Sequence, residues 1–301
     1  MYQTMGLEQQ SLMFEMETTM IQAMLKQEES GYAVKDYLQN LPSYTSLGEP
    51  VDAQARSIIA DWCVKIMGVC QYQRETAAIA VSYLDRFMAS PDGYSVLLDR
   101  SQFQLAALAC VYSAVKVHEQ QALGPELVAK LSNGERTSRE IEKMELRLLQ
   151  AVQWRVHPPT AMAFVRNHIE LIPEDDFDVL TRQALLDLTQ YQVDMSLLDY
   201  EFSIQKSSLL GLAALLNAAD SICEDGSIYA QVGSLILSCT GIRPSSLDKL
   251  RNQLYEMISV KESSFSKPSL PILRKPASGY EAFAKKATNY FTTSPRTVQL
   301  S

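Results

Sequence analysis

The chain has 301 residues, of which 47% are hydrophobic, so it can bury a substantial core and divides most simply into two domains of ordinary size. Its formal net charge of -8 argues against a protein whose main task is to cover nucleic-acid phosphates, because that task needs an excess of Lys and Arg. We therefore expect no direct binding of nucleic acid.

The cysteines and histidines argue against disulfides and metals. The 5 cysteines are odd in number, show no C-x-x-C spacing and have apolar helical neighbours, which is typical of reduced core residues in an intracellular protein. None of the three histidines, His118, His157 and His168, stands four residues from another, so a zinc or iron site has few ligands. No apolar run approaches the ~20 residues of a membrane span. We expect no metal, no cofactor and no membrane partner.

Apolar residues recur at spacings of three and four along most of the chain, which predicts an all-α fold. An amphipathic helix over 7–29 comes first, and a shorter helical piece over 32–41 ends at Pro42. Four longer helices are then predicted at 53–70, 74–88, 101–118 and 137–153. Asp52 is the expected N-cap of the first of these four. Ser138 or Thr137 is the expected N-cap of the last, and Glu140 stands three residues after Thr137 as in a capping box.

Pro158 and Pro159 separate these helices from a second series, predicted at 160–172, 178–197, 206–222, 227–239 and 244–260. The third helix of each series is apolar on every face and rich in Ala, over 103–117 and 208–219, which predicts a helix surrounded by others. The two halves therefore look like weak copies of one five-helix unit.

The composition changes after Val260. Seven basic residues face two acidic ones over 261–301, and four prolines interrupt the segment, which predicts a flexible basic tail. Ser294 precedes a proline, as in sites of proline-directed kinases, and Arg251 to Leu254 fits a minimal Arg-x-x-Leu degradation motif. Both short patterns are frequent by chance, so an unmodified serine and an ordinary helix segment are the competing interpretations.

Four charged residues fall in or beside the apolar stripes of the first half. They are Arg56, Asp85, Lys116 and Glu145, each on a different predicted helix. An unpaired buried charge costs several kcal/mol, so a fold that places these four near its core must pair them or use one of them to contact a partner.

The same residues resemble the cyclin box in order, spacing and type: Arg56 to Trp62, Glu75 to Phe87, Leu105, Lys116, and Met144 with Glu145. The resemblance is strong over about residues 20–155 and weak in the second half, as a second cyclin fold. It implies four parts: an N-terminal helical segment at 1–45, an N-terminal cyclin box at 46–157, a C-terminal cyclin fold at 158–260 and the tail at 261–301. Residues 23–29 look most like D-type cyclins, which implies action at G1 or G1/S.

The resemblance also gives the four charges roles. It implies that Arg56 and Asp85 form an internal ion pair between the first two helices of the box, and that Lys116 and Glu145 form a pair that binds the kinase. The competing interpretation of Lys116 is a lysine at a helix C-terminus that reaches water.

Four further residues, Ile58, Trp62, Phe103 and Gln104, match the cyclin groove that receives short basic and hydrophobic peptides of substrates or inhibitors. Trp62 also lies in the apolar stripe of its own helix, so a core role is the alternative. Two departures predict altered or weaker recognition: Ala55 replaces the usual Met, and Lys65 stands where many members have a Glu that pairs with the peptide's basic residue.

The sequence therefore predicts a cyclin: a regulatory subunit of a cyclin-dependent protein kinase that acts in the nucleus and cytoplasm and controls cell-cycle progression. No Gly-rich phosphate loop, G-x-S-x-G motif or nucleophile beside a His is visible, so we expect no enzyme and no catalytic residue. The alternatives are a transcription-related cyclin fold of the initiation-factor type and a scaffold that binds no kinase.

Overall fold

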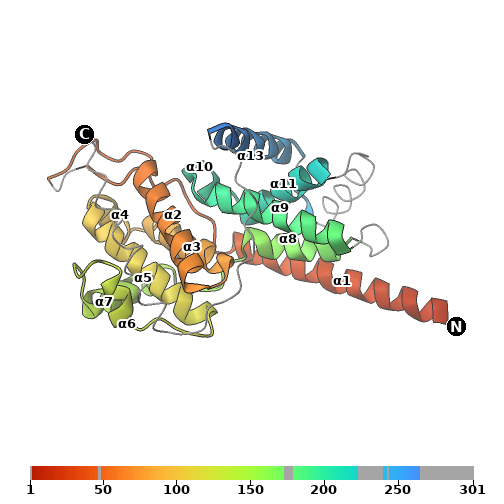
Figure 1. Cartoon of the computed structure of the whole chain (residues 1–301), viewed down its shortest axis with the longest axis horizontal. Helices are drawn as coiled ribbons and strands as arrows, with labels where there is room; N and C mark the ends of the chain where they lie inside the picture. Colours follow the sequence, from red (N-terminus) through yellow and green to blue (C-terminus); the bar gives the residue numbers. More distant parts are fainter. Residues whose placement is uncertain (1, 47–48, 173–178, 223–239, 243, 265–301) are drawn as a thin grey trace. The chain divides into compact units, whose positions relative to one another are not determined.

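The computed structural model describes residues 2–46, 49–172, 179–222, 240–242 and 244–264 (Figure 1). These residues form helices and contain no β-strand, which confirms the all-α prediction. Their contacts define two compact units. We call residues 34–158 with 197–204 the box unit, and the described residues of 1–33, 159–196 and 205–268 the composite unit.

The box unit surrounds one apolar helix. Every residue of α5 from Leu105 to Val115 is buried, and α5 packs between α3 and α7, as its composition predicts. The predicted bounds of the four long helices are correct to within two residues. The helices of this unit are α2 (Ala53–Cys70), α3 (Arg74–Met88), α4 (Tyr94–Leu97), α5 (Arg100–His118), α6 (Pro125–Lys130), α7 (Ser138–Ala151) and α10 (Tyr200–Ser203).

Capping explains two of these bounds. The Asp52 carboxylate accepts the backbone N–H of Ala55 at 2.7 Å and begins α2. The Thr137 side chain and that of Glu140 satisfy each other's backbone N–H groups, so the predicted capping box is present at the start of α7. The short helices α4 and α6 have too few residues to show an apolar period, and the sequence did not predict them.

The composite unit has its own apolar centre, α11, which packs against α8 and α13. Gly211 permits the approach of α11 to α8, because a Cβ at this position would lie 2.6 Å from the carbonyl oxygen of Ala161. The helices of this unit are α1 (Tyr2–Glu29), α8 (Ala161–Glu170), α9 (Val179–Leu197, whose last residue belongs to the box unit), α11 (Ser207–Ile222) and α13 (Pro244–Ser264).

The N-terminal helix α1 is part of the composite unit. The Glu28 carboxylate, 3% exposed, accepts the Ser208 backbone N–H at 2.9 Å and the Ser208 hydroxyl at 2.6 Å. A carboxylate at this point satisfies donors that the start of α11 leaves open and interacts favourably with its helix dipole. The end of α1 is therefore fixed to α11, and the two compact units do not follow the linear order of the four parts inferred from the sequence.

One helix prediction is wrong. Residues 33–37 have no regular structure, and no helix forms over 32–41. The Asp36 carboxylate accepts the backbone N–H groups of Leu38 at 3.3 Å and Gln39 at 3.2 Å, a local turn that competes with helix formation. The predicted helix at 227–239, the tail beyond Ser264, Ser294, Cys223 and Cys239 lie outside the described residues.

The described cysteines are reduced, and the degradation motif predicted from the sequence lies in a helix. Cys63, Cys70 and Cys110 are free thiols, and burial raises the pKa of Cys63 to about 12. The Arg-x-x-Leu motif lies within α13, where Leu254 is fully buried and Arg251 pairs with Asp220. Among the described helices, none combines the length and apolar character that crossing a membrane requires.

His168 on α8 is a buried base in the composite unit. Its residue exposure is 0%, and neither ring nitrogen has a hydrogen-bond partner within the described part of the chain. Burial lowers the pKa of His168 from 6.5 to about 4. The folded state therefore holds a neutral imidazole at a pH where the unfolded chain binds a proton.

We predict that the composite unit is fully stable above pH 6.5 and loses up to about 3 kcal/mol as the pH falls toward 4, because only the unfolded state gains the proton. Urea unfolding of the full chain at several pH values measures this loss. His168→Leu, an apolar side chain of similar size, should remove most of this pH dependence. An unchanged pH dependence in that variant would assign the effect to other groups.

Candidate functional site

The first two anomalous charges form a buried pair between α2 and α3. The guanidinium of Arg56 binds the Asp85 carboxylate through two atoms, Nη2 to Oδ2 at 2.8 Å and Nε to Oδ1 at 3.1 Å. The exposed fractions are 1% for Arg56 and 3% for Asp85. Two parallel hydrogen bonds fix the relative orientation of the two helices as well as their charges. The geometry is that of the internal pair expected from the sequence.

Two distant segments of the box unit meet at this pair. The Tyr37 hydroxyl donates to Asp85 Oδ1 at 2.7 Å, and Arg56 Nη1 donates to the carbonyl oxygen of Leu197. The Tyr200 hydroxyl accepts the Tyr37 backbone N–H at 2.9 Å, and the two rings meet edge to face at 5.1 Å. Sequence reasoning missed these three partners, because their spacing along the chain carries no signal.

The electrostatics of the pair explain its stability in a dry site. Burial alone would lower the pKa of Arg56, but the adjacent Asp85 charge outweighs it and the net pKa shift is upward. Burial, followed by the Asp85 charge, raises the pKa of Tyr37 well above its usual value. Arg56 therefore stays charged and Tyr37 stays a neutral donor, so all the polar atoms that converge here are matched.

The second pair of anomalous charges joins α5 to α7. Lys116 Nζ lies 3.0 Å from Glu145 Oε1 and 3.1 Å from Oε2, and the Ser113 hydroxyl also donates to Oε1 at 3.2 Å. The Lys116 side chain is 48% exposed, whereas that of Glu145 is 10% exposed. The pair therefore has a buried anion and a solvent-facing cation, unlike the pair formed by Arg56 and Asp85.

The surroundings hold the lysine charged and in place. Desolvation alone would lower the pKa of Lys116, but its hydrogen bond to Glu145 and the Glu145 charge outweigh it, so the pKa rises. The ammonium also lies 5.0 Å from the centroid of the Tyr112 ring. A carboxylate and an aromatic face thus hold Lys116 beside α7, and its head remains accessible to a partner.

Large apolar residues that neighbour this pair in the sequence are exposed. Val117, next to Lys116, is 39% exposed; Leu146, next to Glu145, is 51% exposed; and Trp154, just after α7, is 62% exposed. An exposed aromatic near a half-desolvated ion pair is typical of protein–protein interfaces. We call Lys116, Glu145, Val117, Leu146 and Trp154 the α5–α7 face. Sequence reasoning missed the three apolar members, because nothing in the local sequence signals that these side chains are exposed.

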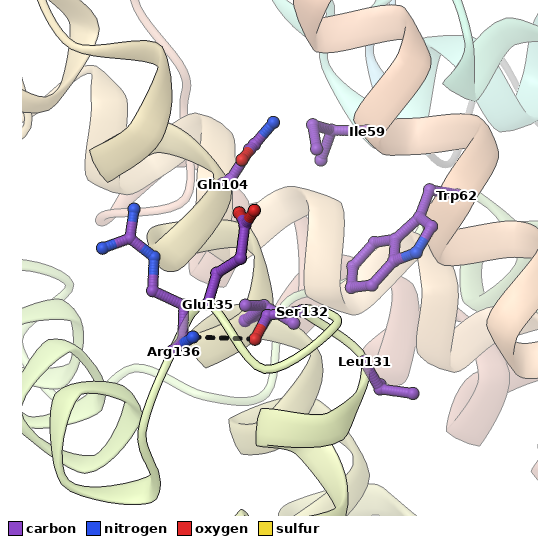
Figure 2. Close-up of a pocket in the computed structure, with 8 residues that line it drawn as sticks. Ile59, Trp62, Gln104, Leu131, Ser132, Glu135 and Arg136 are labelled. Atoms are coloured by element: carbon purple, nitrogen blue, oxygen red, sulfur yellow. Dashed lines mark hydrogen bonds between the residues drawn. The ribbon is translucent and has the colours of Figure 1, made fainter. Parts of the chain in front are cut away.

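A shallow pocket that is partly open to solvent lies elsewhere on the box unit. Figure 2 shows Trp62 on one side and Arg136 on another, with the Glu135 carboxylate directed toward Gln104. Arg136 is fixed by the Ser101 carbonyl oxygen, which accepts from Nη2 at 2.7 Å. The lining residues are Ile59, Trp62, Gln104, Leu108, Leu131, Ser132, Glu135 and Arg136.

The pocket contains two of the four residues expected in a peptide groove. Trp62 and Gln104 line it, whereas Ile59 lines it in place of Ile58, and Phe103 is 2% exposed in the core. Lys65 is exposed and pairs with Asp61 at 2.5 Å, four residues earlier on α2. An apolar pocket with a few polar side chains can hold one side chain of an extended peptide.

The described residues offer no metal site, since no three His, Cys, Asp or Glu side chains among them gather where an ion could bind.

The family model of the cyclin N-terminal domain matches residues 19–157. Cyclin-A1-2 of Oryza sativa subsp. japonica is 24% identical over 80% of this chain and 48% of its own length, and G1/S-specific cyclin-E1 of Gallus gallus is 26% identical over 62% and 46%. The chain spans about half the length of the curated relatives it matches. A viral cyclin from herpesvirus saimiri shares the fold, with a TM-score of 0.53, 20% identity, and coverage of 74% of this chain and 95% of that one.

We predict that Arg56→Met or Asp85→Leu alone destabilises the box unit by about 3–5 kcal/mol, because each leaves a buried charge without its partner. The double variant should cost less than the sum of the two, since it removes both charges. Urea unfolding of the full chain, with a double-mutant cycle, measures the coupling. Lys65→Met is the matched control: it breaks an exposed ion pair and should change the unfolding free energy by less than about 1 kcal/mol. If the free-energy losses of the two single variants add up to that of the double variant, Arg56 and Asp85 are not coupled.

Proposed function

Because this chain belongs to the cyclin family, we propose that it binds and activates a cyclin-dependent protein serine/threonine kinase as its regulatory subunit and supplies no catalytic group itself. The observation that carries the proposal is the pair of Lys116 and Glu145. Its anion is buried, its cation faces solvent, and the residues that follow Lys116 and Glu145 in the sequence, Val117 and Leu146, are exposed and apolar. An ion pair with a purely structural role does not require exposed apolar residues near it. A partner protein that docked here would cover these residues together with Lys116.

The α5–α7 face can act on a kinase by selecting one of its conformations. The two residues of the pair already bind each other, so little ordering of this surface remains when a partner docks. A kinase becomes active when its regulatory helix and activation segment adopt one arrangement, and a subunit that binds this arrangement better shifts the population toward it. We expect an interface of standard size or larger, ~1,600 Å² or more, with Lys116 near its centre.

The pocket beside Trp62 is the second proposed contact, for substrate or inhibitor peptides. Its apolar walls suit a hydrophobic side chain, and Glu135 offers one carboxylate inside. Lys65 on the same helix would repel a basic residue of the peptide. We therefore propose a docking site with weaker preference for basic and hydrophobic peptides than the family's usual groove.

We propose a role in cell-cycle control, in the nucleus and cytoplasm. Timing at G1 or G1/S rests on the resemblance of residues 23–29 to D-type cyclins, while the curated relatives named above and a B2-type relative are of A, B and E types. An initiation-factor-like protein and a scaffold that binds no kinase are the alternatives. Salt-sensitive DNA binding by the full chain would favour the first of these.

We predict that Lys116→Ala combined with Glu145→Ala weakens kinase binding by about 2–5 kcal/mol and abolishes co-purification of the kinase, because the partner's polar groups lose their match. The far-UV circular dichroism of the variant should be unchanged. The control replaces an exposed lysine–glutamate pair of the composite unit, Lys206 and Glu29, with alanines and should leave binding intact. Loss of folding in the first variant would make the Lys116 pair structural.

We predict that Lys65→Glu raises the affinity for a basic and hydrophobic peptide by about fivefold, since it replaces a repulsive charge with an attractive one. Competition against a fluorescent peptide measures the change, with Lys249→Glu on α13 of the composite unit as a control for net charge. Ordinary affinity of the wild-type chain for such a peptide would overturn the proposed weaker preference.

A further inference from the structure

The turn that follows α7 has an unusual backbone. Gln153 and Trp154 are consecutive and both have positive φ, 56° and 58°. For a residue with a Cβ, this left-handed conformation is about tenfold less favourable than the ordinary one, and it persists only where the surrounding structure imposes it. Such a turn is therefore maintained by its contacts, and each contact can be identified.

Two side chains of α3 donate hydrogen bonds to carbonyl oxygens of the turn. Arg86, 8% exposed, donates from Nη1 to the Arg155 carbonyl oxygen at 2.8 Å and from Nη2 to the Val152 carbonyl oxygen at 3.1 Å. The Tyr83 hydroxyl donates to the carbonyl oxygen of Val156. A buried guanidinium at the end of a helix satisfies terminal carbonyls and interacts favourably with the helix dipole. Arg86 thus bridges the residues on both sides of the left-handed pair.

The backbone of the turn adds two bonds of its own. The Gln153 N–H donates to the Gln150 carbonyl oxygen at 3.0 Å, and the Trp154 N–H donates to the Leu149 carbonyl oxygen at 2.8 Å. These bonds close the end of α7 in the manner of a Schellman motif, for which glycine is the usual residue. Here a glutamine and a tryptophan take the left-handed positions.

The turn lies close to the α5–α7 face. The His118 imidazole, two residues beyond Lys116, contacts the Val156 carbonyl oxygen at 2.9 Å, and its ring meets that of His157 at 5.0 Å. The segment that contains Trp154 therefore runs beside the end of α5. Val152, before the turn, is 4% exposed, whereas Trp154 is 62% exposed. The turn thus leaves a tryptophan exposed two residues after the buried Val152.

We propose that Trp154 is the aromatic anchor of the kinase interface and that Arg86 is the positioning residue that presents it. The proposal rests on the proposed function, and it adds which side chain carries much of the binding and what prepares it. Trp is enriched among the residues that dominate interface affinity, and an anchor held rigid before binding loses less conformational freedom on docking. The charged side chain of Lys116 and the aromatic side chain of Trp154 thus both belong to the α5–α7 face.

The two tryptophans of the chain make this directly measurable. Trp62→Phe leaves Trp154 as the only indole of the chain, so the fluorescence of the free chain reports on the turn alone, and 7-azatryptophan at this position can be excited apart from the tryptophans of a partner. In this background, addition of the kinase that co-purifies with the wild-type chain should shift Trp154 emission to shorter wavelength and reduce its quenching by acrylamide. Emission that stays unchanged while the kinase binds would overturn the proposal.

Three variants separate the anchor from its support. Trp154→Ala, at an exposed position, should weaken kinase binding by about thirtyfold without loss of helicity. Arg86→Gln should increase acrylamide quenching of Trp154 before any kinase is added and weaken binding by about tenfold. Adding Gln153→Gly to Arg86→Gln should recover much of that affinity, because glycine adopts the left-handed conformation without strain. Gln153→Gly alone should bind within about twofold of the wild type.

The outcomes distinguish this inference from the proposed function. Trp154→Ala that binds the kinase within twofold overturns the anchor, and Arg86→Gln with unchanged quenching and affinity overturns the positioning role. In both cases loss of binding in the Lys116 and Glu145 double variant would leave the proposed function standing. If Arg86→Gln does not fold, Trp154→Ala alone decides the proposal.

Discussion

The buried ion pair of Arg56 and Asp85 is the interaction on which the box unit depends. It lies between α2 and α3, and through Tyr37 and Leu197 it also fixes two segments that enter the unit from distant parts of the chain. Because a buried charge without a partner is strongly unfavourable, neither α2 nor α3 can move without the other. α3 in turn packs against α5 and carries Tyr83 and Arg86, so the pair indirectly fixes the surface at the ends of α5 and α7.

The two ion pairs of the box unit have different physical character. Arg56 and Asp85 are both buried and surrounded by matched donors and acceptors, an arrangement that specifies geometry more than it adds net stability. Lys116 is half exposed above a buried Glu145, so its charge is only partly desolvated in the free protein. A partner that covers Lys116 would remove the remaining water from its ammonium group, and the ion pair with Glu145 would already be formed when it does so. The same residue types therefore organise the fold at one site and present a surface at the other.

Much of this could be predicted from sequence, because helices and pairs follow local rules. The apolar period predicted the four long helices of the box unit to within two residues, and the caps at Asp52 and Thr137 fixed two of their starts. The sequence could not predict the turn at Asp36, where a side chain competes with helix formation, or the meeting of Tyr37 with Tyr200 across the unit. The exposure of Trp154 also escaped prediction, because it depends on a left-handed backbone that nothing in the local sequence requires.

The central claim is that the α5–α7 face binds the kinase. Hydrogen exchange of the full chain, with and without the kinase that co-purifies with it, tests this claim most directly, because bound surfaces exchange more slowly. We expect slower exchange in residues 112–118 and 142–156 of the complex, with the pocket beside Trp62 unchanged. Slower exchange confined to α8, α11 and α13, with none in these two segments, would contradict it.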